Sequence, residues 1–130
     1  MRNKQLCVLA VDCSTDALNL IKLSLEATTK WRVLMSSCFQ EALVRARQES
    51  PDMILINFQM SQMNSIEMAM KLKSHPKTDE IPLLLITSLP RVVSSQAFQD
   101  FGITNVIEKP LNWFSLADLI VLSFKYSRSN

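Results

Sequence analysis

The sequence predicts an α/β fold, a doubly wound parallel sheet with helices on both faces. Five short apolar segments alternate with five segments of helical periodicity over 130 residues, and such strict alternation is typical of parallel sheets. Two of the apolar segments, MILI at 53–56 and LLLI at 83–86, contain no polar residue, as expected for central strands covered on both sides. With 48% hydrophobic residues, the chain 1–130 is predicted to be one domain with a proper core.

The elements follow one another from the amino terminus to a polar tail at 127–130. The predicted strands cover residues 5–11, 31–36, 53–56, 83–86 and 105–107, and the predicted helices cover 15–28, 39–49, 65–74, 91–101 and 113–126. In the first helix, Leu18, Ile21 and Leu25 recur at helical spacing and form one apolar face. Thr15 or Asp16 can cap the start of that helix.

Start and stop signals support several other elements. Asp12 interrupts the first apolar segment, QLCVLAV, which we therefore interpret as a strand rather than a secretion signal. Ser65, with Glu67 behind it, marks the start of the third helix. Pro90 is placed to open the fourth helix, and Gly102 is placed to close it in a left-handed turn.

Composition and charge exclude several functional classes. The net charge is +2 with 20% charged residues, and the densest basic group, Arg45 and Arg47, is expected to be a solvated helix face, so neither nucleic acid nor a membrane surface is indicated as a partner. No apolar run approaches the roughly 20 residues that span a bilayer. The three cysteines lack metal-ligand spacing, which favours a reduced, cytoplasmic protein. His75 lies alone in a loop, which excludes Ser-His-Asp and Cys-His catalysis; no enzyme activity is predicted.

Polar residues follow each predicted strand, where parallel α/β sheets gather their ligands and reactive groups. The first strand is followed by Asp12-Cys13-Ser14, the third by Asn57, the fourth by Thr87-Ser88 and the fifth by Glu108-Lys109-Pro110. These strand ends, in VLAVDCST, PDMILIN, IPLLLITS and VIEKP, resemble the motifs of the CheY-like receiver domain of two-component response regulators. The resemblance covers nearly the whole chain, and it implies a flavodoxin-like, five-stranded sheet of order 2-1-3-4-5.

The resemblance also implies a role for each strand-end residue. Asp12 and Cys13 occupy the positions of the acidic pair, and Asn57 occupies that of the phosphoacceptor aspartate. Thr87 and Lys109 match the switch hydroxyl and the pocket lysine. Two further positions complete the comparison: Val106 stands where the family has an aromatic switch residue, and Pro110 is the candidate for a cis peptide bond.

The departures from the family pattern predict that phosphoryl chemistry has been lost. Three carboxylates around one lysine give a family site a charge of about −2, which magnesium balances. Here Asp12 and Lys109 cancel, so we expect no metal site, no cofactor, and weak or absent magnesium binding. Asn57 cannot form an acyl phosphate. We expect its oxygen to accept a hydrogen bond from Lys109 and its NH2 group to donate one to Asp12.

The residues leave several alternatives open. Thr87 can bond local backbone instead of acting as a switch. Cys13 is expected to be buried and inert, the alternative being a redox sensor together with Cys38. A working receiver could instead accept phosphate at Ser61, at Asn64 after deamidation, or at Thr87. A flavin or other small-ligand carrier is a third class, which the absence of a Gly-rich phosphate loop argues against.

The last predicted helix, WFSLADLIVLSF, is apolar on more than one face. We expect Trp113, Leu116, Ile120 and Ser123 to face the sheet. The candidate interface residues are Val106, Leu119, Leu122 and Phe124. Such a surface predicts docking of another signalling protein (a kinase, a phosphotransfer protein or an output protein), or a homodimer through the face that helix 4, strand 5 and helix 5 form in receivers. The alternative is packing of these residues against the sheet edge or the first helix. The resulting hypothesis is a pseudo-receiver of two-component or phosphorelay signalling that acts by protein–protein interaction.

Overall fold

A computed structural model of the chain describes residues 5–57, 64–88, 103–109 and 112–129. Its strands are β1 (Cys7–Val11), β2 (Arg32–Ser36), β3 (Met53–Asn57), β4 (Leu83–Thr87) and β5 (Ile103–Glu108). Its helices are α1 (Thr15–Thr28), α2 (Phe39–Glu49), α3 (Asn64–Lys73), the short 3-10 helix η1 (Trp113–Ser115) and α6 (Leu116–Ser129). The helix predicted at 91–101, its flanking Pro90 and Gly102, and the predicted cis peptide at Pro110 lie outside the described residues.

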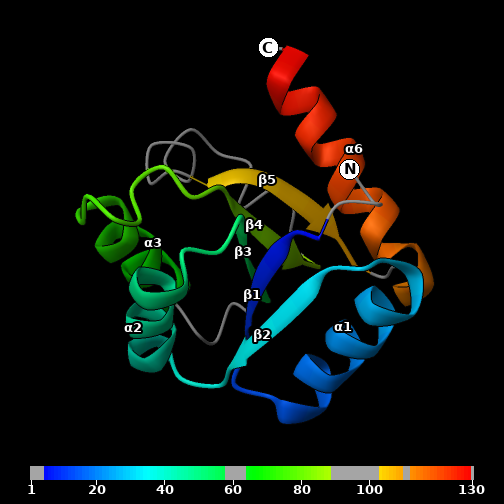
Figure 1. Cartoon of the computed structure of the whole chain (residues 1–130), viewed down its shortest axis with the longest axis horizontal. Helices are drawn as coiled ribbons and strands as arrows, with labels where there is room; N and C mark the ends of the chain where they lie inside the picture. The colour runs from blue at the N-terminus through cyan, green and yellow to red at the C-terminus, as the bar shows by residue number, and fades with distance from the viewer. Residues whose placement is uncertain (1–4, 58–63, 89–102, 110–111, 130) are drawn as a thin grey trace.

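The five strands form one parallel sheet of order β2-β1-β3-β4-β5, so the predicted fold class and strand order are confirmed. Figure 1 shows the sheet as the centre of the molecule, with β1 between β2 and β3. The predicted strand boundaries agree with the structure to within two residues; β5, for example, begins at Ile103 rather than Asn105. Continuous apolar runs in β3 and β4 reflect full burial, because all five residues of each strand are buried.

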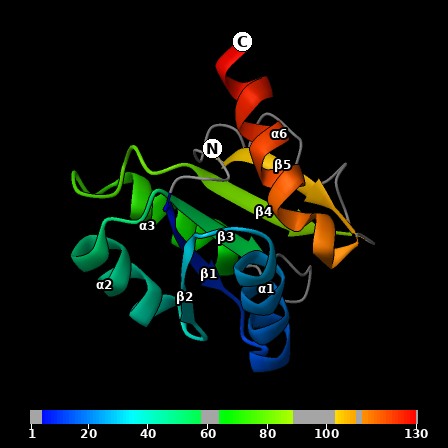
Figure 2. The same ribbon diagram turned by 45° about the vertical axis from the view of Figure 1, so that its right-hand side comes forward.

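Helices cover both faces of the sheet in pairs. Figures 1 and 2 show α1 and α6 on one face and α2 and α3 on the other. Successive residues of each strand alternate between the two faces, so the core divides into two clusters. In β1, Leu9 and Val11 join the cluster under α2 and α3, whereas Val8 and Ala10 join the cluster under α1 and α6. The doubly wound architecture therefore contains two apolar layers, one on each face of the sheet.

Helix α1 begins at a cap that differs from the prediction. The N-cap is Ser14, whose Oγ accepts a 3.2 Å hydrogen bond from the N–H of Ala17, so the expected caps Thr15 and Asp16 are wrong. The predicted apolar face of α1 is confirmed, since Leu18, Ile21 and Leu25 are buried. The observed cap lies one residue before the predicted Thr15, and this difference leaves the apolar face of the helix unchanged.

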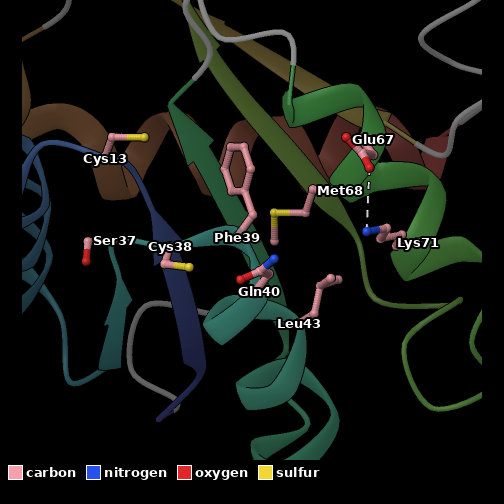
Figure 3. A pocket seen from close by; sticks show the side chains of 9 residues that line it. All are labelled: Cys13, Ser37, Cys38, Phe39, Gln40, Leu43, Glu67, Met68 and Lys71. Atoms are coloured by element: carbon pink, nitrogen blue, oxygen red, sulfur yellow. Dashed lines mark ion pairs between the residues drawn. The ribbon is translucent and has the colours of Figure 1, made fainter.

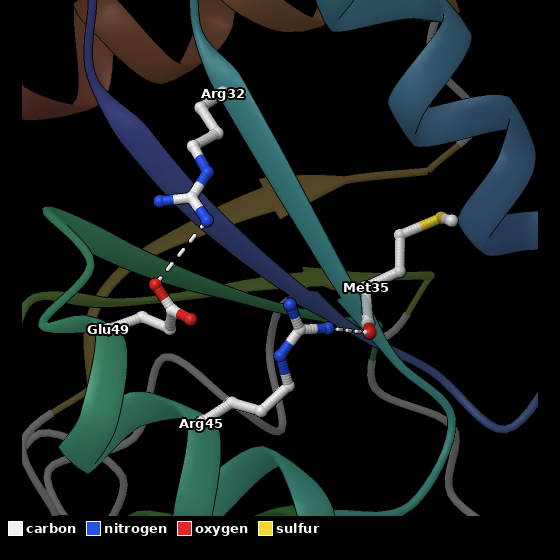
Figure 4. Close-up of polar contacts among 4 residues, drawn as sticks. All are labelled: Arg32, Met35, Arg45 and Glu49. Carbon is white, nitrogen blue, oxygen red and sulfur yellow. Dashed lines mark hydrogen bonds and ion pairs between the residues drawn. The ribbon is translucent and has the colours of Figure 1, made fainter.

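Helix α2 contacts the outer edge strand through side chains at two of its turns. Figure 4 shows Arg45 donating a 2.8 Å hydrogen bond to the carbonyl of Met35, and Arg32 of β2 pairing with Glu49 at 3.4 Å. Arg45 is half-buried, so the prediction that it belongs to a solvated face is wrong, although Arg47 is exposed. The side chain of Arg45 extends from α2 to β2, where its guanidinium binds the strand backbone.

The carboxyl-terminal elements are tied to α1. The buried Ser24 of α1 donates a 2.5 Å hydrogen bond from its Oγ to the carbonyl of Trp113 in η1. Within the described part of the chain, no helix combines the length and the hydropathy needed to cross a bilayer.

Candidate functional site

The strand register brings four of the predicted site residues to one edge of the sheet. Val11 pairs with Ile56, which places Asp12 beside Asn57 at the carboxyl ends of β1 and β3. Asn57 pairs with Ile86, so Thr87 follows one position later on the neighbouring strand. Thr87 in turn pairs with Glu108, which is followed by Lys109. The site predicted from sequence is therefore assembled at the edge where such sheets bind ligands.

Asp12 and Asn57 form the centre of this site. The side-chain NH2 of Asn57 donates a 2.6 Å hydrogen bond to Asp12 Oδ2, and Asp12 Oδ1 accepts a 3.1 Å bond from the backbone N–H of Ser14. Asp12 is 3% exposed and Asn57 is 6% exposed. The predicted bond from the amide to the carboxylate is confirmed, and it leaves both carboxylate oxygens with a donor.

The other predicted bond, from Lys109 to the amide oxygen, is not formed. Asn57 Oδ1 is buried and has no hydrogen-bond partner among the described residues. Ion pairs in the same part of the chain include Lys22 with Glu26, Arg32 with Glu49 and Lys71 with Glu67, and none is recorded there between Lys109 and a carboxylate. Of the cluster expected from Asp12, Asn57 and Lys109, only the Asn57–Asp12 hydrogen bond is therefore formed, and Lys109 lies nearby without bonding to either residue.

Lys109 is held at the site through its backbone. Its N–H donates a 2.7 Å hydrogen bond to the carbonyl of Thr87, which extends the ladder between β4 and β5. Burial lowers the pKa of the half-buried Lys109 ammonium, and the nearby Asp12 carboxylate raises it by a smaller amount. The lysine therefore experiences the field of Asp12 without a direct contact.

Thr87 and Val106 occupy the remaining family positions. Thr87 is 0% exposed at the end of β4. Val106 is half-buried and packs against the apolar cluster under α2 and α3. Whether Thr87 acts as a switch or bonds only local groups stays a prediction.

Cys13 lies at the acidic-pair position with an exposed side chain. The prediction that Cys13 is buried is therefore wrong: the residue lies in the short connection between the end of β1 at Val11 and the N-cap Ser14 of α1, outside both apolar clusters. Cys38, after β2, is exposed as well. Both cysteines line a cavity of about 290 Å³, shown in Figure 3. The sequence placed them on neighbouring strand ends but gave no sign of a shared cavity.

The candidate interface residues on α6 differ in exposure. Leu116 and Ile120 are fully buried and face the sheet as predicted, and Leu119 is half-buried against the same cluster. Leu122 is 48% exposed, whereas the side chain of Phe124 lies outside the described residues. Sequence reasoning missed Phe114, which is 72% exposed; its aromatic neighbour Trp113 is half-buried against the core.

An open parallel sheet with an acid, an amide, a buried hydroxyl and a lysine at its carboxyl edge defines a receiver-type signalling fold. The family model of the response regulator receiver domain matches residues 8–121. The chain therefore belongs to this family, the receiver domains of two-component signalling.

Solved structures with the same fold include the chemotaxis response regulator CheY4 of Vibrio cholerae, with a TM-score of 0.80 and 22% identity over 92% of this chain and 99% of that one. A putative response regulator from Chloroflexus aurantiacus has a TM-score of 0.78 and 19% identity over 94% and 99% of the two chains. At sequence identities this low, the similarity to these structures shows that the fold is shared and nothing more. An uncharacterized 14.6 kDa protein in the sodA1 3′ region of Leptolyngbya boryana is 25% identical over 116 residues, 89% of this chain and 88% of that protein.

The donor groups at the strand ends do not fit the magnesium ion that the family implies. Magnesium prefers several hard oxygen ligands in octahedral geometry. Asp12, whose two oxygens each accept one hydrogen bond, supplies a single carboxylate, and Cys13 offers a soft thiol instead of a second one. Among the described residues, no three His, Cys, Asp or Glu side chains form a group that could hold a metal ion.

Proposed function

We propose that the protein is a pseudo-receiver, a receiver domain of two-component signalling that acts by protein–protein interaction without phosphorylation of an aspartate. The observation that supports this proposal is the 2.6 Å hydrogen bond from the Asn57 amide to Asp12. Asn57 stands at the phosphoacceptor position, and its amide donates a hydrogen bond there instead of attacking phosphorus.

The chemistry of the amide supports this proposal in two ways. An amide nitrogen has no free lone pair, because the pair is delocalised onto the carbonyl, and the amide oxygen carries no formal charge. Asp12, the nearest carboxylate to Asn57 among the described residues, has its Oδ2 bound to that amide. Neither the Asn57 amide nor the Asp12 carboxylate is arranged to attack a phosphoryl donor. The single negative charge of Asp12 is balanced by Lys109, so no negative charge remains for a metal ion to neutralise. We therefore propose that the protein has no enzyme activity and binds magnesium weakly or not at all.

A phosphorylation assay tests the proposal directly. Wild-type protein, Asn57→Asp, Cys13→Asp and the double variant Asn57→Asp/Cys13→Asp are incubated with acetyl phosphate and magnesium, and their intact masses are measured. We expect a phosphoryl mass gain in the double variant alone, because only this variant regains both the nucleophile and the second metal carboxylate. Hydroxylamine should remove the added group, as it does from an acyl phosphate.

Each other outcome contradicts a part of the proposal. A phosphoryl gain on the wild-type protein would mean that another residue accepts phosphate. Thr87 is a poor candidate for such a role, since it is 0% exposed. A gain in Asn57→Asp alone would mean that the Cys13 position does not limit metal binding. No gain in any variant would mean that more than these two positions separates the protein from a working receiver.

The proposed docking surface lies at the carboxyl-terminal end of the chain. Leu122 and Phe114 are 48% and 72% exposed, and Figures 1 and 2 show the last turns of α6 extending beyond the sheet. We propose that Leu122 of α6 and Phe114 of η1 belong to one apolar surface, since such surfaces favour contact with another protein. We propose that the partner is a second signalling protein or a second copy of this chain. The three cysteines are free thiols, which agrees with the proposed cytoplasmic location.

A further inference from the structure

Cys13 and Cys38 occupy equivalent positions on two neighbouring strands. Val11 of β1 pairs with Ser36 of β2, and the N–H of Asp12 donates a 3.2 Å hydrogen bond to the carbonyl of Ser36. Each cysteine therefore lies two residues beyond the last pair of the same ladder. Neighbouring strands lie about 4.8 Å apart, and the Cα atoms of a disulfide are about 4.4–6.8 Å apart. The register thus brings the two cysteines to neighbouring strand ends, from which the chain continues to α1 and α2 on opposite faces of the sheet. A bridge between them therefore requires the two loops to move toward each other.

The two thiols are also accessible from the same space. Both side chains are exposed, and both line the cavity of about 290 Å³ between the carboxyl ends of the strands, α2 and α3. Figure 3 shows Cys13 on the loop after β1 and Cys38 on the loop after β2, with both side chains directed toward the cavity. A small molecule that enters the cavity therefore meets two nucleophilic sulfur atoms.

We propose that Cys13 and Cys38 form a dithiol site that reacts with a low-molecular-weight peptide disulfide, such as oxidised glutathione, and closes to an intramolecular disulfide. This site goes beyond the proposed signalling function and uses no residue of the Asp12–Asn57 hydrogen bond.

The reaction balances as two successive thiol–disulfide exchanges. The thiolate of one cysteine attacks a sulfur of the small disulfide, forms a mixed disulfide and releases one small thiolate. The second cysteine then attacks the protein sulfur of that mixed disulfide, forms the Cys13–Cys38 bond and releases the second small thiolate. The two protons lost by the cysteines end on the two small thiols, so the protein is oxidised by two electrons and the small disulfide is reduced.

The cavity lining offers apolar and polar groups to one half of a small peptide disulfide. Phe39, Leu43 and Met68 supply an apolar wall, while Gln40 and Lys71 supply an amide and an ammonium. These polar groups can bind the amides and carboxylates of a peptide thiol. Lys71 also pairs with Glu67 at 3.5 Å, but its side chain is 54% exposed, so that pair is easily exchanged. The volume is near the lower limit of ligand pockets, about 300 Å³.

Cys7 provides an internal control for these two thiols. It opens β1 at the opposite end of the strand and is half-buried. Burial raises the pKa of the Cys7 thiol, with a further rise from Asp52 that Arg32 opposes. Because the thiolate is the reactive form, Cys7 should react more slowly than an exposed cysteine.

The test is oxidation of the whole chain by oxidised glutathione, followed by alkylation of remaining thiols, intact mass measurement and non-reducing peptide mapping. After alkylation, we expect the wild-type protein to carry one alkyl group, on Cys7, and to be otherwise lighter by the mass of two hydrogen atoms. Peptide mapping should yield a Cys13–Cys38 linked peptide. Cys13→Ser should stop at one glutathionyl group on Cys38, and Cys38→Ser should stop at one on Cys13. Cys7→Ser should behave as the wild type. Circular dichroism of each variant checks that the fold is kept.

Three results would overturn the proposal. The first is stable glutathionylation of Cys13 and Cys38 in the wild type without a link between them. The second is a linkage that joins two chains and whose yield rises with protein concentration. The third is preferential reaction of Cys7, or no reaction of any thiol, in protein that remains folded.

Discussion

The side-chain nitrogen of Asn57 lies 2.6 Å from Asp12 Oδ2, although the two residues are 45 positions apart in the chain. The contact is buried and depends on an NH2 group at the position where receivers carry a carboxylate. Asn57 is thus more than a lost nucleophile, because it contributes a hydrogen bond that a carboxylate could not make.

We predict that Asn57→Asp destabilises the folded protein near neutral pH. The substitution replaces a donor with a second carboxylate beside Asp12, which costs about 1–3 kcal/mol through the lost hydrogen bond and like-charge repulsion. Repulsion raises the pKa of the introduced carboxyl, so the folded variant binds more protons than the unfolded chain. The loss of stability should therefore shrink as pH falls from the raised pKa toward the ordinary value of about 4.

Urea unfolding at several pH values checks this prediction. Asn112→Asp is the matched control, because Asn112 is an exposed N-cap whose Oδ1 accepts a bond from Phe114 N–H, and aspartate caps equally well. Equal unfolding free energies for the two variants at neutral pH would contradict the importance of the Asn57 contact.

Lys109 should titrate below its ordinary pKa of 10.5, because burial lowers the pKa and Asp12 opposes the shift only in part. We predict that Asp12→Asn lowers the pKa of Lys109 further, since it removes the opposing charge. The folded state releases this proton first, so stability should rise with pH between the lowered pKa and 10.5. Carbon-13 NMR titration of the lysine Cε signals measures the pKa. The exposed Lys30 should not change, and an equal response of both lysines to Asp12→Asn would contradict the placement of Lys109.

The N-cap of α2 offers a stabilising substitution. Cys38 is the N-cap and makes no side-chain hydrogen bond to the helix, and Glu41 lies in its first turn. Cys38→Ser supplies a hydroxyl three residues before this glutamate, which is the spacing of a capping box. We predict a gain of about 0.5–1.5 kcal/mol in unfolding free energy, measured by thermal or urea unfolding. Cys38→Ala lacks the oxygen and should give no such gain; a gain of the same size would assign the effect to loss of the thiol.

The docking surface on α6 can be tested with two residues of equal exposure. Leu122 on α6 and Val44 on α2 are both 48% exposed, but they lie on opposite faces of the sheet. We predict that Leu122→Glu weakens self-association about tenfold, because a buried carboxylate is costly in an apolar interface, whereas Val44→Glu has little effect. Sedimentation equilibrium measures the dissociation constant. A wild-type chain that stays monomeric at all concentrations would exclude the homodimer, and equal effects of both substitutions would exclude this face.

The fold could be predicted because its strands are short apolar runs separated by helices. Burial on both faces leaves no polar residue in β3 or β4 before the last position of each strand. The cap of α1 could not be fixed to one residue, because Ser14, Thr15 and Asp16 are consecutive and all are good caps. The exposure of Cys13 was mispredicted for a different reason. Residue type gives only a prior for burial, and the direction in which a loop turns decides the outcome.

Inside the site, one predicted hydrogen bond is formed and the other is not. The Asn57–Asp12 bond follows from strand register, because two short side chains at adjacent strand ends have few rotamers and most of these bring them into contact. The expected Lys109–Asn57 bond required a long side chain to adopt one of many rotamers. The pKa of Lys109 likewise depends on burial and on the nearby Asp12, and neither is visible in a linear sequence.

The contact between Arg45 and the carbonyl of Met35 has a consequence for how the protein can assemble. β2 is an outer strand of the sheet, and such a strand is a template for β-augmentation by another chain. An incoming strand would have to displace the guanidinium from Met35 and lie beside the charged, exposed Arg32. The β2 border of the sheet is thereby protected against edge-to-edge aggregation.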